Sequence, residues 1–263
     1  MHHTEGSSPL QNNKTSSGAS TNQNLMEWDK LWTINKKIID PVCPRHTAVL
    51  EDRRVMITIT DGPVEPFVRI IPRHKNCKAA GDKCTSYTKN IWIDYADALS
   101  ISANEEVTLM DWGNAIIKEI KRDETGTIVQ LLGVLHLEGS VKKTKLKLTW
   151  LPETDELVRL QLVEFDHLIT KKKLAKIKKK KGAKTKEEKM QEEEDFLNAV
   201  NPVTRKDTFA LGDSNMRNRN LIPGEIIQLE RKGYFRCDVP FLRHTKPVVL
   251  FAIPDGRKHN VMQ

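Results

Sequence analysis

The sequence predicts a mainly β fold of antiparallel β-barrels, preceded by a short helical segment. The hydrophobic period of the chain becomes two at residues 53–60, where Val55, Ile57 and Ile59 alternate with more polar neighbours. Similar short segments recur to the end of the chain, separated by turn sequences such as DETGT at 123–127. Many short strands joined by regular turns favour barrels over a parallel sheet. A chain of 263 residues has room for two modest cores or one large all-β unit.

One helix is expected before the strands. Residues 26–40 place Trp28, Leu31, Ile34 and Ile38 on one face at helical spacing, and two prolines shortly afterwards end the pattern. We expect the tryptophans of this helix to pack in the core rather than to stack on a ligand, because aromatic residues at this spacing normally form a buried face.

The strand-like segments follow the helix in a regular series. They are residues 53–60, 87–95, 105–112, 113–122, 127–139, 145–151, 157–165, 224–235 and 246–254. The longest strongly apolar run, 248–253, is far shorter than the roughly 20 residues that a membrane span needs, so we expect no membrane partner.

The first 24 residues and the cysteine content bear on localisation. Residues 1–24 are rich in Ser, Asn, Gly and Thr and lack an apolar signal region, so they are expected to be a disordered or expression-derived leader. Four cysteines in a chain of this length do not form a dense disulfide framework, which favours a reducing compartment. The expected location is the cytosol.

A lysine-rich tract carries much of the positive charge. Residues 171–195 hold 11 lysines against 6 acidic residues, which accounts for +5 of the net charge of +8. The tract has two readings, a solvated insertion or an arm that follows RNA phosphates without sequence preference. The lysines proposed for nonspecific RNA contact are Lys171, Lys172, Lys173, Lys178 and Lys179.

Signatures of catalysis and metal binding are weak or missing. The sequence has no glycine-rich phosphate loop, no G-x-S-x-G elbow and no H-E-x-x-H pair, so no catalytic residue is assigned. His74, Cys77 and Cys84 supply three ligand types without a convincing fourth, and a surface loop is the better explanation, so no metal site is predicted. His46 and His136 are interpreted as structural or surface residues.

Four long segments resemble a known family. Residues 24–50, 105–120, 148–154 and 223–238 are similar to the C-terminal half of eukaryotic or archaeal-type glutamyl-tRNA synthetases, which are class I enzymes. The similarity runs from about Asn24 to Gly256. It implies a helical connector at 25–49, a proximal barrel of residues 50–102 and 223–263, and a distal barrel of residues 103–222 that contains the lysine-rich insertion.

The resemblance implies a role in translation. The region would recognise tRNA(Glu) for the ATP-dependent attachment of glutamate, in the cytoplasm, with other synthetases or scaffold proteins as further possible partners. The family's catalytic signatures lie upstream of the matched region and are missing here, so ATP and Mg²⁺ are expected to belong to the parent enzyme, with no cofactor in this chain. The alternatives are the glutaminyl sister enzyme and a noncatalytic β-barrel module that binds RNA or proteins.

The resemblance also nominates site residues. It implies that Arg45, Gln228 and Arg231 contact splayed anticodon bases, whose exposed edges suit a guanidinium or an amide. Two readings remain for Trp112, a base-stacking platform or a buried turn residue. Asn114 is either an anticodon contact or a cap of the same turn.

Overall fold

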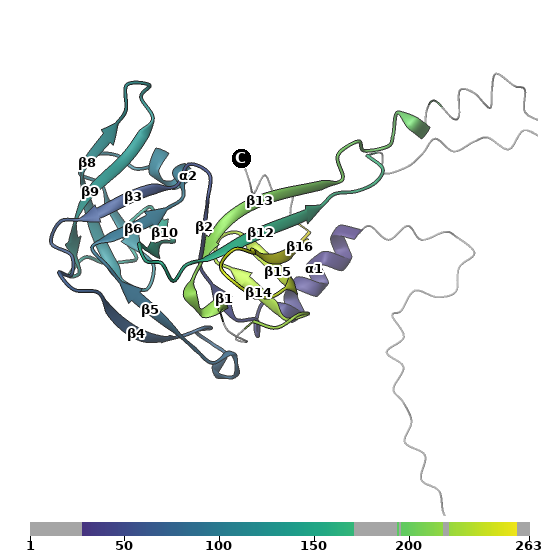
Figure 1. The fold of residues 1–263 in the computed structure, drawn as a ribbon, viewed down its shortest axis with the longest axis horizontal. Coiled ribbons are helices and arrows are strands. Elements are labelled where there is room, and N and C mark those ends of the chain that lie inside the picture. The colour runs from purple at the N-terminus through teal and green to yellow at the C-terminus, as the bar shows by residue number, and fades with distance from the viewer. Residues whose placement is uncertain (1–27, 171–193, 195, 218–220, 257–263) are drawn as a thin grey trace, which may run out of the picture.

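Two curled seven-stranded sheets carry most of the described chain, and a two-stranded hairpin lies beside them (Figure 1). The computed structural model describes residues 28–170, 194, 196–217 and 221–256. The N-terminal sheet has the strand order β10–β7–β8–β9–β3–β6–β11. It consists of β3 (Val55–Ile59), β6 (Asn90–Ile93), β7 (Glu106–Leu109), β8 (Gly113–Arg122), β9 (Ile128–His136), β10 (Lys147–Leu148) and β11 (Leu151–Pro152).

The C-terminal sheet has the order β1–β14–β15–β16–β12–β13–β2. It consists of β1 (Arg45–His46), β2 (Ala48–Leu50), β12 (Val158–Phe165), β13 (Arg205–Gly212), β14 (Ile226–Leu229), β15 (Gly233–Val239) and β16 (Val248–Ile253). The hairpin pairs β4 (Phe67–Pro72) with β5 (Asp82–Tyr87), and the helices are α1 (Trp28–Ile39), α2 (Tyr95–Leu99), η1 (Lys78–Ala80) and η2 (Ser214–Met216).

The mainly β fold is confirmed, and the period-two pattern has its expected cause. Val55, Ile57 and Ile59 of β3 are buried, while the residues between them are partly exposed. Each curled sheet closes around its own apolar core. Both sheets also contain parallel pairs, such as β3 with β9 and β12 with β16.

The predicted division of the chain at residues 102 and 222 is wrong. It separated β3 from β9 and β12 from β16, yet each of these pairs lies side by side in one sheet. Ile57 and Leu131 are register partners on β3 and β9, and both are fully buried in the same core. The chain changes sheet twice: it leaves the C-terminal sheet between Leu50 and Val55 and returns to it between Pro152 and Val158.

Neither β13 nor the hairpin is among the predicted strands. The first half of β13 is exposed, and β4 is exposed along nearly its whole length. These segments therefore lack the alternation of apolar and polar residues that marks a half-buried strand. Figure 1 shows the hairpin reaching from the N-terminal sheet toward β1.

Helix α1 matches the predicted span but not the predicted burial. Trp28, Ile34 and Ile38 are 57–66% exposed, and Trp28 stacks on Trp32 at a ring separation of 5.7 Å. The last turn of the helix packs on the C-terminal sheet, where Ile39 is buried. The expected core packing of Trp28 is therefore wrong in this structure. Within the described residues, no helix combines the length and apolarity needed to cross a bilayer.

Candidate nucleic-acid interface

Two of the predicted site residues lie next to each other on the C-terminal sheet. β1 and β14 are parallel, and Arg45 is the register partner of Gln228. Their neighbours His46, Ile227 and Leu229 are buried, so Arg45 and Gln228 point to the outer face of the sheet. The structure thus brings together side chains from positions that are far apart in the sequence.

Both side chains carry a buried polar atom without a partner. Nε of Arg45 and Oε1 of Gln228 have no hydrogen bond among the described residues. Leaving a buried donor or acceptor unsatisfied costs about 1–3 kcal/mol, and folded proteins contain few such groups. Both residues are otherwise partly exposed, so a polar ligand could form hydrogen bonds with the exposed ends of the two side chains.

Asp40, directly after α1, connects this helix to β15 and to the β4–β5 loop beside the Arg45–Gln228 pair. Tyr234, the register partner of Gln228 on β15, places its hydroxyl against the Asp40 carboxylate. Burial and this hydrogen bond raise the pKa of Tyr234 well above its usual value. His74, at the end of the hairpin, binds the Asp40 carbonyl through Nε2 at 3.1 Å and accepts from the Asn76 amide through Nδ1 at 3.1 Å. Both ring nitrogens of His74 are thus engaged within the protein.

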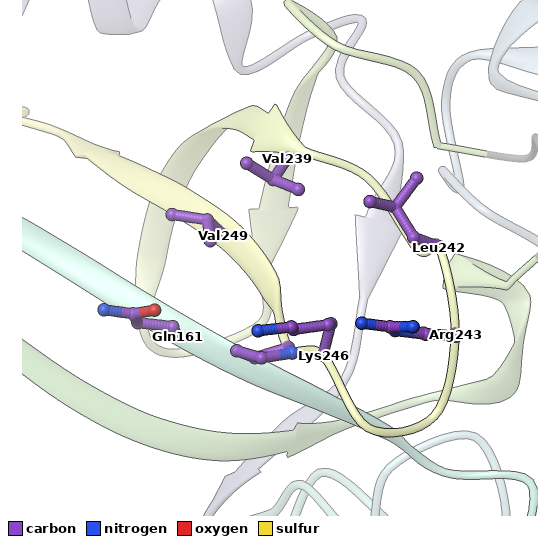
Figure 2. A pocket seen from close by; sticks show the side chains of 7 residues that line it. Gln161, Val239, Leu242, Arg243, Lys246 and Val249 are labelled. Carbon is purple, nitrogen blue, oxygen red and sulfur yellow. The ribbon is translucent and has the colours of Figure 1, made fainter.

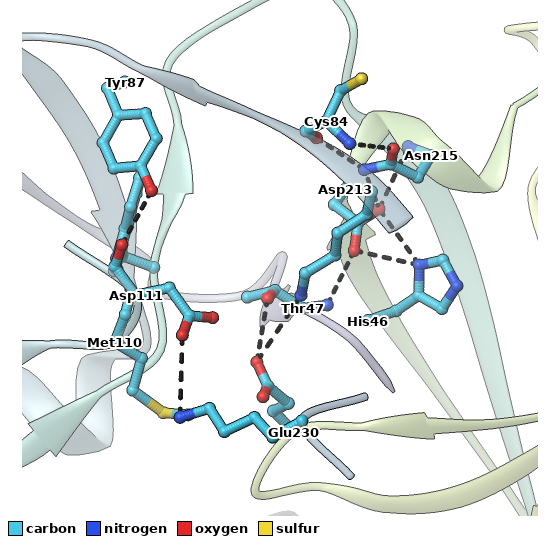
Figure 3. A network of polar contacts seen from close by, with 12 residues as sticks. His46, Thr47, Cys84, Tyr87, Met110, Asp111, Asp213, Asn215 and Glu230 are labelled. Atoms are coloured by element: carbon cyan, nitrogen blue, oxygen red, sulfur yellow. Dashed lines mark hydrogen bonds and ion pairs between the residues drawn. The ribbon is translucent and has the colours of Figure 1, made fainter. Parts of the chain in front are cut away.

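A buried network fixes β1 from the inner side (Figure 3). The Asp213 carboxylate lies 3.1 Å from Nδ1 of His46 and accepts from the Thr47 amide at 2.8 Å. Burial acts to raise the pKa of Asp213, but His46, Lys83 and the Thr47 amide outweigh it and hold this pKa well below its usual value. His46 is therefore a structural residue, in agreement with the sequence interpretation.

The same network attaches the hairpin to the C-terminal sheet. The Asn215 side chain accepts from the Cys84 amide and donates to the Cys84 carbonyl, each at 2.8 Å. Lys83 lies 4.0 Å from Glu230, which also accepts from the Thr47 hydroxyl at 3.4 Å. Figure 3 shows how these contacts connect β5, β1 and the β14–β15 turn. The hairpin end is thereby held beside Arg45.

Arg231 is engaged elsewhere. It occupies the β14–β15 turn with a φ of 65°, and its guanidinium makes two hydrogen bonds to the Asp97 carboxylate, at 2.6 and 2.7 Å. The adjacent Lys232 pairs with Asp94. These ion pairs connect the C-terminal sheet to α2, beside the N-terminal sheet. The predicted base contact of Arg231 stays a prediction, and it would require the guanidinium to leave Asp97 or to share its hydrogen bonds with the base.

Trp112 and Asn114 belong to the core of the N-terminal sheet. Trp112 is 9% exposed and packs edge-on to Tyr87 at 5.2 Å and against Trp150 at 5.0 Å. Asn114 is fully buried; it accepts from the Thr108 hydroxyl at 2.9 Å and donates to Glu106 at 2.8 Å. The burial and the internal partners of both side chains favour the structural interpretation of each residue over a contact with an anticodon base.

Five predicted RNA contacts lie outside the described residues, and a further hollow with polar lining lies elsewhere on the C-terminal sheet. Lys171, Lys172, Lys173, Lys178 and Lys179 lie outside the described residues. A shallow hollow at the far end of β15 is lined by Gln161, Val239, Leu242, Arg243, Lys246, Pro247 and Val249 (Figure 2). Its exposed Arg243 offers a positive charge away from the Arg45–Gln228 pair.

One residue that the sequence interpretation missed lies beside the pair. The Arg73 carbonyl accepts the Arg45 amide at 2.9 Å, and Nε of Arg73 is a further buried atom without a hydrogen bond among the described residues. Arg73 follows β4, which is exposed along nearly its whole length, so no alternation of apolar and polar residues marks this position in the sequence. The partnership of Arg231 with Asp97 likewise has no local signal, because 134 positions separate the two residues.

Comparison with protein families defines the class. Two models described as "tRNA synthetases class I (E and Q), anti-codon binding domain" match residues 43–138 and 147–238. Together they cover most of the chain. Their boundary does not coincide with the division into sheets, because the first match includes β1 and β2 of the C-terminal sheet and the second includes β10 and β11 of the N-terminal sheet. The chain belongs to this family of anticodon-binding domains.

Curated relatives narrow the class to the glutamate branch. The chain is 63% identical over 240 residues to the cytoplasmic glutamate–tRNA ligase of Arabidopsis thaliana, covering 91% of this chain and 31% of the relative. It is 42% identical over 251 residues to the cytoplasmic glutamate–tRNA ligase of Saccharomyces cerevisiae, covering 95% and 32%. It is 33% identical over 253 residues to the bifunctional glutamate/proline–tRNA ligase of Drosophila melanogaster, covering 93% and 14%. The resemblance to glutamyl-tRNA synthetases is confirmed, and the chain spans about a third of the first two relatives.

Proposed function

We propose that this chain binds the anticodon of tRNA(Glu) for a cytoplasmic glutamate–tRNA ligase. The observation that carries the proposal is the Arg45–Gln228 pair, two outward side chains in register whose buried polar atoms have no hydrogen bond among the described residues. The family description and the glutamate–tRNA ligase relatives support the same role.

The pair suits an unstacked RNA base. A base splayed from its stack presents donors and acceptors along one planar edge, and planar guanidinium and amide groups match that edge. Paired strands hold Arg45 and Gln228 more rigidly than a loop would. Both residues are partly buried, so the base would contact the exposed ends of two side chains that are already partly desolvated.

The chain would serve recognition and not the chemical step. ATP and Mg²⁺ would act in the reaction of the parent ligase, and no described residue is assigned a role toward them. The bifunctional glutamate/proline relatives make linkage to another synthetase a possible partnership. The glutaminyl branch of the family is the second candidate function, because the matching models cover both E and Q enzymes.

The first prediction concerns tRNA preference. We expect the chain to bind tRNA(Glu) transcripts more tightly than tRNA(Gln) or unrelated tRNAs, and to keep this order as salt is raised, because base contacts differ among the RNAs whereas phosphate contacts do not. Equilibrium titrations at two salt concentrations measure this. Preference for tRNA(Gln) would support the glutaminyl branch. Equal binding at low salt with equal release at high salt would indicate a nonspecific RNA-binding module.

A further inference from the structure

We propose that Arg73 is a third base-contacting residue, which reads a nucleotide adjoining the one bound by Arg45 and Gln228. This inference rests on the proposed anticodon-binding function. Neither the family comparison nor the sequence interpretation assigns a role to Arg73.

The backbone places Arg73 on the free side of β1. The carbonyls of Pro44 and His46 accept from β14, whereas the amide of Arg45 points the other way and donates to the Arg73 carbonyl at 2.9 Å. The Arg73 amide in turn donates to the Gly81 carbonyl at 2.9 Å. Three adjacent chain segments therefore carry Gln228, Arg45 and Arg73 in that order across the sheet edge.

Arg45 and Arg73 differ from Arg54 and Arg217, which also have a buried Nε without a partner but bind backbone carbonyls through their Nη atoms. Nε of Arg45 and Nε of Arg73 are both buried without a hydrogen bond, and neither guanidinium forms an ion pair among the described residues. Their backbones are hydrogen bonded to each other, so two cations without a carboxylate partner lie on adjacent segments, an arrangement that favours a ligand that supplies hydrogen-bond acceptors. RNA supplies acceptors both on its base edges and on its phosphates.

The burial of Arg73 favours a base edge over a phosphate. Lys75, on the same loop, has a side chain that is 71% exposed and lies 3.9 Å from Asp111, so its charge remains accessible to solvent or a phosphate. Arg73 is half-buried, and its Nε is removed from solvent. A partly desolvated planar group loses little further hydration on binding and matches a planar acceptor edge.

A structural role for the Arg73 guanidinium would require a hydrogen bond or an ion pair, and its side chain forms neither among the described residues. Because Nε has no partner among the described residues, replacing the side chain with methionine removes an unsatisfied group while keeping the aliphatic packing. We expect Arg73→Met to melt at the same temperature as the unmodified chain or higher, as is common when a binding residue is removed. Thermal unfolding followed by circular dichroism measures this.

The decisive test uses Arg73→Met and Arg73→Lys in the full 263-residue chain. Titrations use tRNA(Glu) transcripts with each base of the anticodon loop changed in turn. We expect both variants to lose about 5- to 150-fold in affinity for unmodified tRNA(Glu), the range of a good bidentate base contact. Lysine should not rescue, because it keeps the charge but lacks the planar fork. The loss should disappear for RNAs changed at one particular base.

Arg243→Met is the matched control, because Arg243 is an exposed arginine beside the hollow at the far end of β15. It should change affinity equally for every loop sequence. The proposal is overturned if Arg73→Lys binds like the unmodified chain, if Arg73→Met loses nothing, or if the loss is the same for every base, which would indicate a phosphate contact. Failure of the unmodified chain to prefer tRNA(Glu) would instead refute the proposed function itself.

Discussion

Replacing Asp213 with alanine is expected to lower the free energy of unfolding by about 3–5 kcal/mol, because each buried group left without its acceptor costs about 1–3 kcal/mol. Asp213 is 9% exposed and accepts hydrogen bonds from the Thr47 amide at 2.8 Å and from the Asn215 side chain at 3.0 Å. Its carboxylate also lies beside the fully enclosed ring of His46. Alanine would leave all three groups without their acceptor. Urea denaturation measures the loss.

Asp207→Ala is a suitable control, because Asp207 binds Arg205 on the exposed surface of β13, where ion pairs contribute about 0–1 kcal/mol. A loss below 1 kcal/mol for Asp213→Ala would show that the buried network does not stabilise the fold.

Asp213 should also determine part of the loss of folding stability at acid pH. The folded-state pKa of Asp213 lies below the unfolded value of about 3.9, so its contribution to stability is fully present at higher pH. That contribution is lost as pH falls from about 4 toward the folded-state pKa. Asp213→Asn cannot ionise, so its stability should fall less steeply over this range. Equal acid slopes for the two proteins would contradict the assignment.

Replacing Trp112 with alanine is expected to cost about 3–5 kcal/mol of unfolding free energy, because a large buried aromatic leaves a cavity that the core fills only partly. Trp112 packs against Tyr87 and Trp150 in the core of the N-terminal sheet. Under conditions where the variant stays folded, its affinity for tRNA(Glu) should be unchanged. Denaturant unfolding and tRNA titration together separate the two effects.

Trp28→Ala provides the matched comparison on helix α1. Trp28 is 60% exposed, so its removal should change the unfolding free energy by no more than about 0.5 kcal/mol. If Trp112→Ala instead retained its stability and lost tRNA affinity, the base-stacking reading of Trp112 would be restored.

The sequence was informative where local pattern determines structure. Period-two alternation identified β3, because a half-buried strand must alternate inward and outward side chains. The resemblance also selected Arg45 and Gln228, which strand pairing brings together. Trp112 remained ambiguous, since an aromatic residue in a turn suits both a core and a stacking surface.

Long-range pairing was beyond the reach of local pattern. The predicted barrel boundaries failed because the pairing of β3 with β9 joins segments more than 70 positions apart, as at Met56 and Gln130. The ion pair between Arg231 and Asp97 spans 134 positions and depends on how the two sheets are placed. Neither partner's local sequence specifies the other.

The central claim is that Gln228, together with Arg45, reads an anticodon base, whereas Arg231 joins the two sheets. The most direct measurement is a double-mutant cycle that combines Gln228→Met with a change at each anticodon base of tRNA(Glu), with Arg231→Ala measured in parallel. We predict a coupling of about 1–3 kcal/mol between Gln228 and one base, because removing either partner already abolishes the contact. Arg231→Ala should affect all anticodon sequences alike. Full additivity for Gln228 at all three bases, or a base-specific coupling for Arg231 alone, would contradict the claim.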